Sequence, residues 1–447
     1  MKALIIHGLR FDSRLTTFQH TLAFARHLHG FEVTYVNGQG LIDEKVLTQT
    51  FDIAIVTYEL LALRNTPFWV YIEERVAALL QSSKIRVAMP QDDYSSSFAL
   101  DNFIVENKVQ HVFSPLTRDL VMIYPRSLAA GVKFSEAFTG YWETKTDLPF
   151  QQYRRDFDLR SIDVGQRVRH LPPQLGPAAQ KKGEMAIKLA EAAQDQGFLC
   201  DVSTKDSDVL IGPDWWKFLG NTKFTVGRLG GASVVDTHGN LARKVTQLQL
   251  RNPKISFEEI AKKLHTDQLP QGDFSAISPR LFECAAMGVC QVLEKDNYFE
   301  NFQPWVDYLP LDADLNNLVE VFSAMRDVDR CREIANHAEA TLIKSGKYSY
   351  FEFVKRLVKT TLNVDLDADL SPSLVDNDEE LFSGLEFCAI ESVKESVRQS
   401  ITWKKNSGLI EHATIESRWV GAFRKKHLIV ESLILPWCSA LVHLKSS

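Results

Sequence analysis

The stretch Ile277-Ser-Pro-Arg-Leu-Phe-Glu-Cys-Ala-Ala-Met-Gly-Val-Cys-Gln-Val-Leu293 predicts a helix followed by a buried strand, the repeating unit of an α/β fold. Ser278 can cap the helix, and Pro279 suits its first position, where the missing N–H leaves no hydrogen bond unmade. Gly288 then ends the helix. Residues 289–293 are a short apolar run, typical of a strand that is covered on both faces in a parallel sheet.

Two charged side chains lie near the start of this predicted helix. Arg280 and Glu283 are three residues apart, so they share one face of the first turn. The N-terminus of a helix carries a partial positive charge and backbone N–H groups without partners. A helix start of this kind, at the edge of a parallel sheet, suits a nucleotide diphosphate and its ribose.

The alternation of strand-like and helix-like runs extends outward from this stretch. Repeated alternation predicts two parallel, doubly wound sheets, with ligands beyond the carboxyl ends of their strands. The polar stretch 236–271 resembles an insertion, with an amphipathic helix at 257–264. We expect an α/β fold with a Rossmann-like domain at residues 1–150, a second one at 151–360 and a helical C-terminal extension at 361–447. The expected strands are 3–6, 32–36, 53–57, 85–89, 109–113, 159–164, 198–202, 223–226 and 289–293.

Composition excludes several classes of protein. A hydrophobic share of 45%, a charged share of 24% and a net charge of −6 are those of an ordinary globular protein with no general attraction to nucleic acid. The six cysteines form no C-x-x-C pair or Cys/His cluster, so we expect buried thiols in a reducing compartment and no metal. We expect a cytoplasmic protein. The apolar tail at 424–444 is expected to dock as a terminal helix or to touch the inner face of a membrane.

Five segments of the chain resemble those of GT-B glycosyltransferases. They are most similar to a bacterial subgroup related to spore-maturation-type glycosyltransferases, and together they run from about residue 85 to residue 355. The segments are Pro90-Gln-Asp-Asp-Tyr94, Asp163-Val-Gly-Gln-Arg-Val-Arg-His-Leu-Pro-Pro173, Phe224-Thr-Val-Gly-Arg-Leu-Gly-Gly-Ala-Ser233, residues 278–288, and Gln303-Pro-Trp-Val-Asp-Tyr-Leu-Pro-Leu311.

The resemblance implies two Rossmann-like domains that face each other across a cleft. It implies transfer of a sugar from a nucleotide-diphosphate donor to a hydroxyl acceptor, such as a bacterial surface glycan or glycoconjugate. Glu283 would bind hydroxyls of the donor, and Arg280 would bind the diphosphate with its planar fork, near Ser278. The alternative is that Glu283 only complements the helix dipole and that Arg280 only forms a salt bridge with Glu283. The donor is expected to be a co-substrate, with no separate cofactor or metal.

Two further segments are candidates for phosphate binding. Gly230 and Gly231 follow a strand, and a glycine loop there could offer successive N–H groups to an anion, with Arg228 adding a charge and Ser233 a hydroxyl. A plain turn has the same pattern. The Asp163–Pro173 segment places Arg167 and Arg169 after another strand, as a phosphate clamp or as a basic surface turn.

The catalytic base has three candidates. Asp92 and Asp93 follow the strand at 85–89, where a carboxylate could activate an acceptor hydroxyl. Because neighbouring side chains at a strand end point to different sides, we expect only one of them to face the ligand. Their alternative role is to cap the next helix. His7, at the end of the first strand, is the rival base or a structural histidine.

One departure from the family pattern leaves alternatives open. Many GT-B enzymes carry a second Glu in the glycine loop, ahead of the one that corresponds to Glu283. Ser275 precedes Glu283 with seven residues between, and the Gly-Gly segment has no Glu. The stereochemistry is therefore open. A non-catalytic GT-B-like binding module and a sugar-nucleotide epimerase are the two alternatives.

Overall fold

The structure, a computed structural model, describes residues 1–9, 15–40, 42–143, 150–169, 171–210 and 212–366. All described residues belong to the first of the two units into which the chain divides, Met1–Ile390. The expected helical extension, apart from residues 361–366, lies outside the described residues, and so does the apolar tail at 424–444. Within the described part, no helix is long and apolar enough to cross a membrane.

Residues 2–136 contain a six-stranded sheet in which every recorded strand pair is parallel. Its strand order is β2-β1-β3-β4-β5-β6. The inner strands are apolar along most of their length because helices cover both faces of such a sheet. The strands are β1 (Lys2–His7), β2 (Glu32–Asn37), β3 (Phe51–Val56), β4 (Ser83–Ala88), β5 (His111–Ser114) and β6 (Lys133–Glu136).

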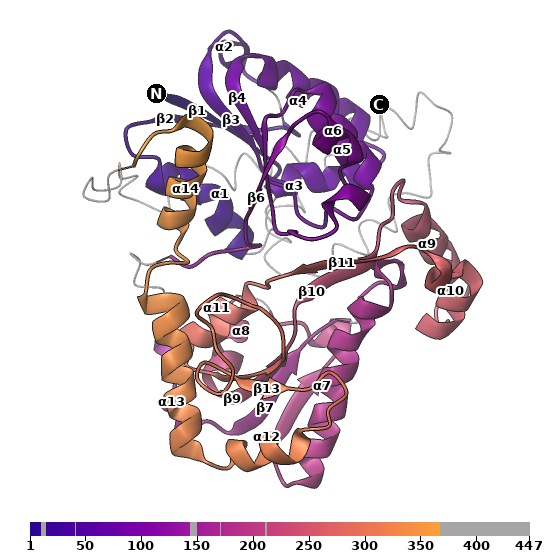
Figure 1. The fold of residues 1–447 in the computed structure, drawn as a ribbon, viewed down its shortest axis with the longest axis vertical. Coiled ribbons are helices and arrows are strands. Elements are labelled where there is room, and N and C mark those ends of the chain that lie inside the picture. The colour runs from indigo at the N-terminus through magenta and orange to yellow at the C-terminus, as the bar shows by residue number, and fades with distance from the viewer. Residues whose placement is uncertain (10–14, 41, 144–149, 170, 211, 367–447) are drawn as a thin grey trace, which may run out of the picture. The chain divides into compact units, whose positions relative to one another are not determined.

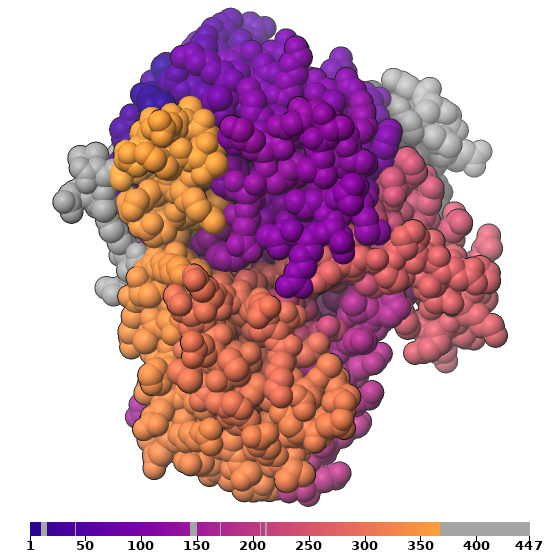
Figure 2. Space-filling model, viewed as in Figure 1, coloured from indigo at the N-terminus to yellow at the C-terminus, as the bar shows by residue number. Residues whose placement is uncertain are grey.

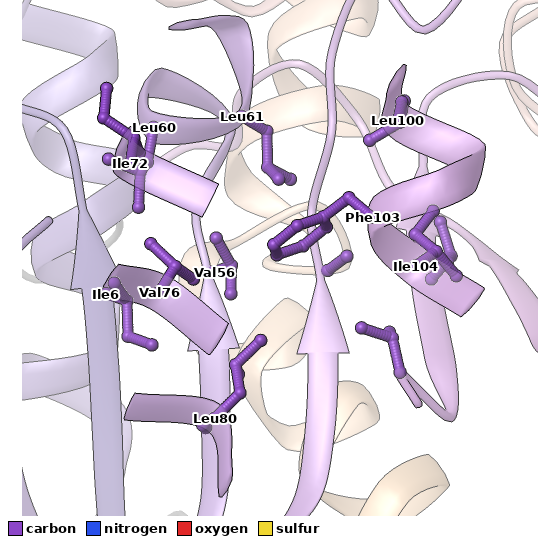
Figure 3. Packing of buried hydrophobic residues seen from close by; sticks show 14 of the residues in the cluster. Ile6, Val56, Leu60, Leu61, Ile72, Val76, Leu80, Leu100, Phe103 and Ile104 are labelled. Atoms are coloured by element: carbon purple, nitrogen blue, oxygen red, sulfur yellow. The ribbon is translucent and has the colours of Figure 1, made fainter. Parts of the chain in front are cut away.

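Helices connect these strands and supply the apolar core. Figure 3 shows one face of the sheet, where Ile6 and Val56 point toward Val76 and Leu80 of α4 and toward Phe103 of α5. The connection between β5 and α6 contains a single 3-10 turn at Leu120–Met122. The helices are α1 (Leu15–His27), α2 (Glu44–Leu47), α3 (Tyr58–Leu61), α4 (Trp69–Gln81), α5 (Ser97–Glu106) and α6 (Pro125–Ala129).

A second parallel sheet, of five strands, confirms the prediction of two doubly wound α/β sheets. Its order is β13-β12-β9-β7-β8, and its recorded pairs are all parallel. The strands are β7 (Ile162–Arg167), β8 (Cys200–Ser203), β9 (Thr222–Gly227), β12 (Cys290–Glu294) and β13 (Leu309–Leu311). The helices are α7 (Pro177–Asp195), α8 (Pro213–Gly220), α11 (Arg280–Ala286), α12 (Leu318–Met325) and α13 (Val328–Glu339).

The segment expected to be an insertion contains more structure than its sequence indicates. The strands β10 (Gly230–Val234) and β11 (Gln271–Ala276) pair antiparallel as a ribbon. Between them lie α9 (Asn240–Arg251) and α10 (Phe257–Leu264), beyond the ends of the ribbon in Figure 1. The helix α10 has the bounds that the amphipathic pattern predicts, and Ser256 and Glu259 close a capping box at its start.

The helix α14 (Tyr350–Leu362) returns to the first sheet after the second sheet is complete. Figure 1 shows it beside α1, and Phe353 of α14 packs against Phe24 and His20 of α1. The helix α14 therefore packs with the first sheet, although it follows the second sheet in the sequence.

Both sheets have a point where the strand order reverses. In the first sheet β1 lies between β2 and β3, and in the second β7 lies between β8 and β9. Doubly wound sheets bind ligands at the carboxyl ends of the strands beside this switch point. The fold therefore marks two places, the ends of β1 and β3 and the ends of β7 and β9.

Candidate functional site

The site in the second sheet is built around α11, which carries Arg280 and Glu283. Arg280 donates from Nη1 to Oε1 of Gln166 at 2.8 Å, and its guanidinium lies 5.2 Å from the ring centre of Trp215. The Trp215 indole N–H donates to Oε2 of Glu283 at 3.0 Å. Trp215 thus contacts both predicted residues, and the aromatic contact favours the charged guanidinium.

Gln166 positions Arg280 from the switch point itself. It is a buried residue of β7, and its amide nitrogen donates to the backbone carbonyl of Val226 on β9. The same side chain therefore ties β7 to β9 and accepts the bond from Arg280. A buried amide with both ends occupied holds its partner in one place.

The start of α11 differs by one residue from the prediction. Pro279 is the N-cap, and Ser278 does not cap the helix with its side chain in the expected way. Its hydroxyl accepts only a long bond, 3.4 Å, from the Arg280 N–H. The reason is geometric, because Pro279 already has helical dihedrals and its carbonyl accepts from the N–H groups of Phe282 and Glu283.

Lys182 is a site residue that the sequence reasoning missed. It lies on α7, and a Cβ placed on Gly230 would be 3.6 Å from its Nζ. Burial, and then the nearby charges of Arg280 and Arg228, lowers the pKa of Lys182 to about 7. Among the described residues no carboxylate forms an ion pair with it. Three cations thus converge beside the switch point.

Arg228 is held from two sides at this cluster. Its Nε lies 2.9 Å from Oε2 of Glu294 at the end of β12, and its Nη1 donates to the carbonyl of Ala178 at 2.8 Å. The ion pair is largely buried and balances one of the three cations. Lys182, Arg228 and Arg280 outnumber the two carboxylates at this place, Glu294 and Glu283, and a local excess of positive charge attracts an anion.

The prediction of a glycine loop at Gly230 and Gly231 is wrong. Both residues belong to β10 and pair with β11, Gly231 opposite Ser275. Gly231 has φ of +130°, and a Cβ there would lie 2.0 Å from the carbonyl oxygen of Phe274. Glycine is needed at position 231 because two backbones approach closely there. Ser233 is buried, and its hydroxyl accepts a 3.4 Å bond from the N–H of Ala178 at the start of α7.

Arg167, the last residue of β7, and Arg169, two residues beyond it, lie in different surroundings. Arg167 donates from Nη2 to the Asp201 carboxylate, with 2.8 Å to its Oδ1, and from Nη1 to the Asp201 carbonyl at 2.8 Å. Its guanidinium also lies 4.4 Å from the ring centre of Phe218. These contacts engage most of its donors. Arg169 is exposed.

In the first sheet, Asp92 and Asp93 differ sharply in exposure. Asp92 is exposed and accepts from the Tyr94 hydroxyl at 2.6 Å. Asp93 is completely buried, and its Oδ2 accepts from the hydroxyls of Ser114 at 2.6 Å and Tyr124 at 2.5 Å. Burial raises the pKa of Asp93. The two carboxylates do point to different sides, as expected, and Asp92 is the accessible one.

A buried arginine shapes the loop that carries these carboxylates. Arg64 donates to the backbone carbonyls of Asp92 at 2.6 Å, Ser95 at 2.9 Å and Gln91 at 3.1 Å. Asp92 has φ of +51°, a left-handed conformation that is uncommon outside glycine. The guanidinium supports this strained turn by satisfying three carbonyls at once.

The switch point of the first sheet holds His7 and Glu59. His7 is buried, burial lowers its pKa to about 4, and its Nδ1 accepts from the Leu9 N–H at 3.2 Å. Glu59 follows β3 and accepts from the Thr21 hydroxyl through Oε1, while its Oε2 has no hydrogen-bond partner among the described residues. Burial raises the pKa of this carboxyl. Glu59 was not predicted from the sequence, although its position just beyond the end of an expected strand could have indicated it.

No protein-family model and no curated protein matches the chain. Among solved structures, HepE from Anabaena in complex with UDP is 9% identical with a TM-score of 0.42, covering 81% of this chain and all of that one. A glycosyltransferase from Rickettsia africae is 10% identical with a TM-score of 0.37, and the match covers 81% of this chain and 98% of that one. TarM is 11% identical with a TM-score of 0.41, and the match covers 69% of this chain. The matched part spans about half of TarM, 54%. Likenesses this remote establish no activity.

Proposed function

We propose that this protein is a glycosyltransferase that takes its sugar from a nucleotide-diphosphate donor. The observation that carries the proposal is Lys182, a half-buried lysine near Arg228 and Arg280 at the switch point of the second sheet, whose pKa is lowered to about 7 by desolvation and by these two charges. Holding a partly desolvated lysine near two arginines is unfavourable unless an anion joins them. A diphosphate there would restore the charge of Lys182 and contact Arg280, whose position is fixed by Gln166.

The same cations would assist the chemical step. The acceptor hydroxyl oxygen bonds to the anomeric carbon while the bond from that carbon to the diphosphate oxygen breaks, and the hydroxyl proton passes to a base. Negative charge then grows on the leaving diphosphate. Lys182, Arg228 and Arg280 would offset this charge, so the proposal requires no divalent metal. Glu283, held by the Trp215 indole, would use its remaining lone pairs for donor hydroxyls.

Asp92 is the base that the geometry favours. It is exposed at the carboxyl end of the first sheet, whereas Asp93 is buried between two hydroxyl donors and His7 already accepts a backbone hydrogen bond. A base must reach the proton it removes. The acceptor class, a bacterial surface glycan or glycoconjugate, and the link to spore-maturation-type enzymes rest on the resemblance of the five sequence segments.

The proposal can be tested by calorimetry with a panel of UDP-, GDP- and dTDP-sugars. We expect the protein to bind sugars of one of these three nucleotides, and we expect Lys182→Met to weaken that binding at least tenfold. Lys181→Met, one residue away on the exposed side of α7, is the matched control and should bind as the wild type does. The proposal fails if no nucleotide-diphosphate sugar binds, or if both variants bind equally well.

A non-catalytic binding module is the second candidate, and Ser275 favours it. Ser275 stands where many GT-B enzymes carry a Glu, and in the structure it lies on β11 with its hydroxyl engaged by Asp273. Slow release of free sugar from the bound donor, without acceptor, would rule this candidate out. Asp92→Asn should leave donor binding intact and abolish transfer.

A further inference from the structure

The outer face of α9 carries several cations although the chain as a whole is acidic. The helix contains Arg243, Lys244 and Arg251 and no acidic residue, although the chain as a whole has a net charge of −6. At about 100° per residue, positions 243, 244, 247, 250 and 251 fall within roughly 120° of one another. All five are exposed. The opposite side, centred on the buried Val245, packs inward.

An apolar side chain lies within this cationic stripe. Leu250 is 77% exposed between Gln249 and Arg251, and Lys254 follows in the turn to α10. In α10 the acidic Glu258 and Glu259 precede Lys262 and Lys263 by four residues, so those charges can compensate one another along the helix. No such compensation is available on α9. Figure 2 shows the α9–α10 surface beside the ribbon.

From these features we infer that the outer face of α9 docks on an anionic lipid surface. Lysine and arginine side chains are attracted to acidic headgroups, each by about 1 kcal/mol near the surface. Leu250 would enter the boundary between headgroups and acyl chains, as apolar residues of interfacial helices do. This exposed leucine favours a lipid surface over a soluble polyanion, which would need charge alone. The inference goes beyond the proposed function and does not depend on it.

The start of α9 is fixed to the loop that carries Asp92. Asp236 caps α9 by accepting from the N–H of Ala242 at 2.9 Å, and its own N–H donates to the carbonyl of Tyr94 at 2.8 Å. The N–H of Phe98 donates to the carbonyl of Thr237 at 3.0 Å. Docking through α9 would therefore bring the Asp92 loop close to the lipid, where a lipid-linked or surface-bound acceptor would meet it.

The test is co-sedimentation of the full chain with vesicles of equal parts phosphatidylglycerol and phosphatidylcholine. The triple variant Lys244→Gln, Arg251→Gln, Lys254→Gln should lower the partition coefficient roughly a hundredfold, from three charges of about 1 kcal/mol each. The control variant Lys45→Gln, Lys108→Gln, Lys188→Gln removes three exposed charges elsewhere and should bind as the wild type does. Equal binding of the triple variant and the wild type overturns the inference.

Two further measurements separate lipid from polymer and docking from catalysis. Leu250→Ser should weaken vesicle binding and leave retention on dextran sulfate unchanged. If Leu250→Ser has no effect on vesicle binding and dextran sulfate competes fully, the partner is a polyanion and the inference is wrong. Lys182→Met should bind vesicles normally, so loss of donor binding and loss of docking are distinguishable.

Discussion

At the scale of single residues, Lys182 shows what the sequence can and cannot predict. Lys181 and Lys182 are adjacent and chemically identical, and helical spacing only places Lys182 on the side of Met185 and Ala186 without indicating which charges lie near it. In the structure Lys181 is exposed, whereas Lys182 is half-buried and close enough to Arg228 and Arg280 for their charges to lower its pKa. Arg280 and Glu283 could be predicted because the helix start and the strand after it are local features. Lys182 could not, since its role depends on which side of α7 faces the ribbon.

The lowered pKa of Lys182 predicts how donor affinity depends on pH. Below pH 7 the free protein already carries the charge, whereas above it each binding event must also take up a proton. Affinity for a nucleotide-diphosphate sugar should therefore fall as pH rises above about 7, by up to tenfold per unit. Calorimetry between pH 6 and pH 9 measures this, and Lys182→Met should remove the slope. If the pH dependence of the affinity persists in Lys182→Met, another titratable group causes it.

At the scale of elements, the contact between α1 and α14 contains an unusual buried histidine. His20 lies among the rings of Tyr58, Tyr141, Tyr350 and Phe353. Neither of its ring nitrogens has a hydrogen-bond partner among the described residues. Burial lowers its pKa to about 4. The apolar periodicity of α1 predicts the helix, but its partner is more than three hundred residues away and is not indicated by any local pattern.

His20 should make the fold sensitive to acid. Because its pKa falls from 6.5 to about 4 on folding, the unfolded chain binds a proton that the folded chain does not. The resulting stability is present above pH 6.5 and is lost as pH falls toward 4, at a cost of about 3 kcal/mol. Urea unfolding at several pH values should show a weaker acid dependence for His20→Leu. His238→Gln, at an exposed position, should match the wild type.

The β10–β11 ribbon explains the main error of the sequence reasoning. Two adjacent glycines after a strand are typical of a loop, and only the partner strand β11 shows that they are a close crossing of two backbones. Because the contact with Phe274 is forty residues distant in sequence, local reasoning could not identify it.

The close crossing of β10 and β11 predicts that replacing two different glycines by alanine lowers the stability of the fold by different amounts. Gly231 and Gly197 both have positive φ, at +130° and +85°, but a Cβ at Gly197 meets nothing within 4 Å. Gly197→Ala should cost only backbone strain, about 1 kcal/mol. Gly231→Ala should cost several kcal/mol because the methyl group collides with the Phe274 carbonyl. Chemical denaturation measures both, and equal costs would contradict the close approach.

At the scale of the whole molecule, periodicity was sufficient to predict two doubly wound sheets. Strand-like and helix-like runs are local, and nearly every expected strand appears within two or three residues of its predicted position. The strand order is not local. The switch points between β1 and β3 and between β7 and β9 follow only from the paired strands. The second of them brings Lys182, Arg228 and Arg280 together from three separate parts of the chain.

The most direct measurement is a crystal structure of the protein with the nucleotide-diphosphate sugar that binds in calorimetry. We expect the diphosphate at the carboxyl ends of β7 and β9, within hydrogen-bond distance of Lys182 and Arg280, with Glu283 on a donor hydroxyl. A diphosphate bound anywhere else, with the Lys182 ammonium left without an anion, would contradict it.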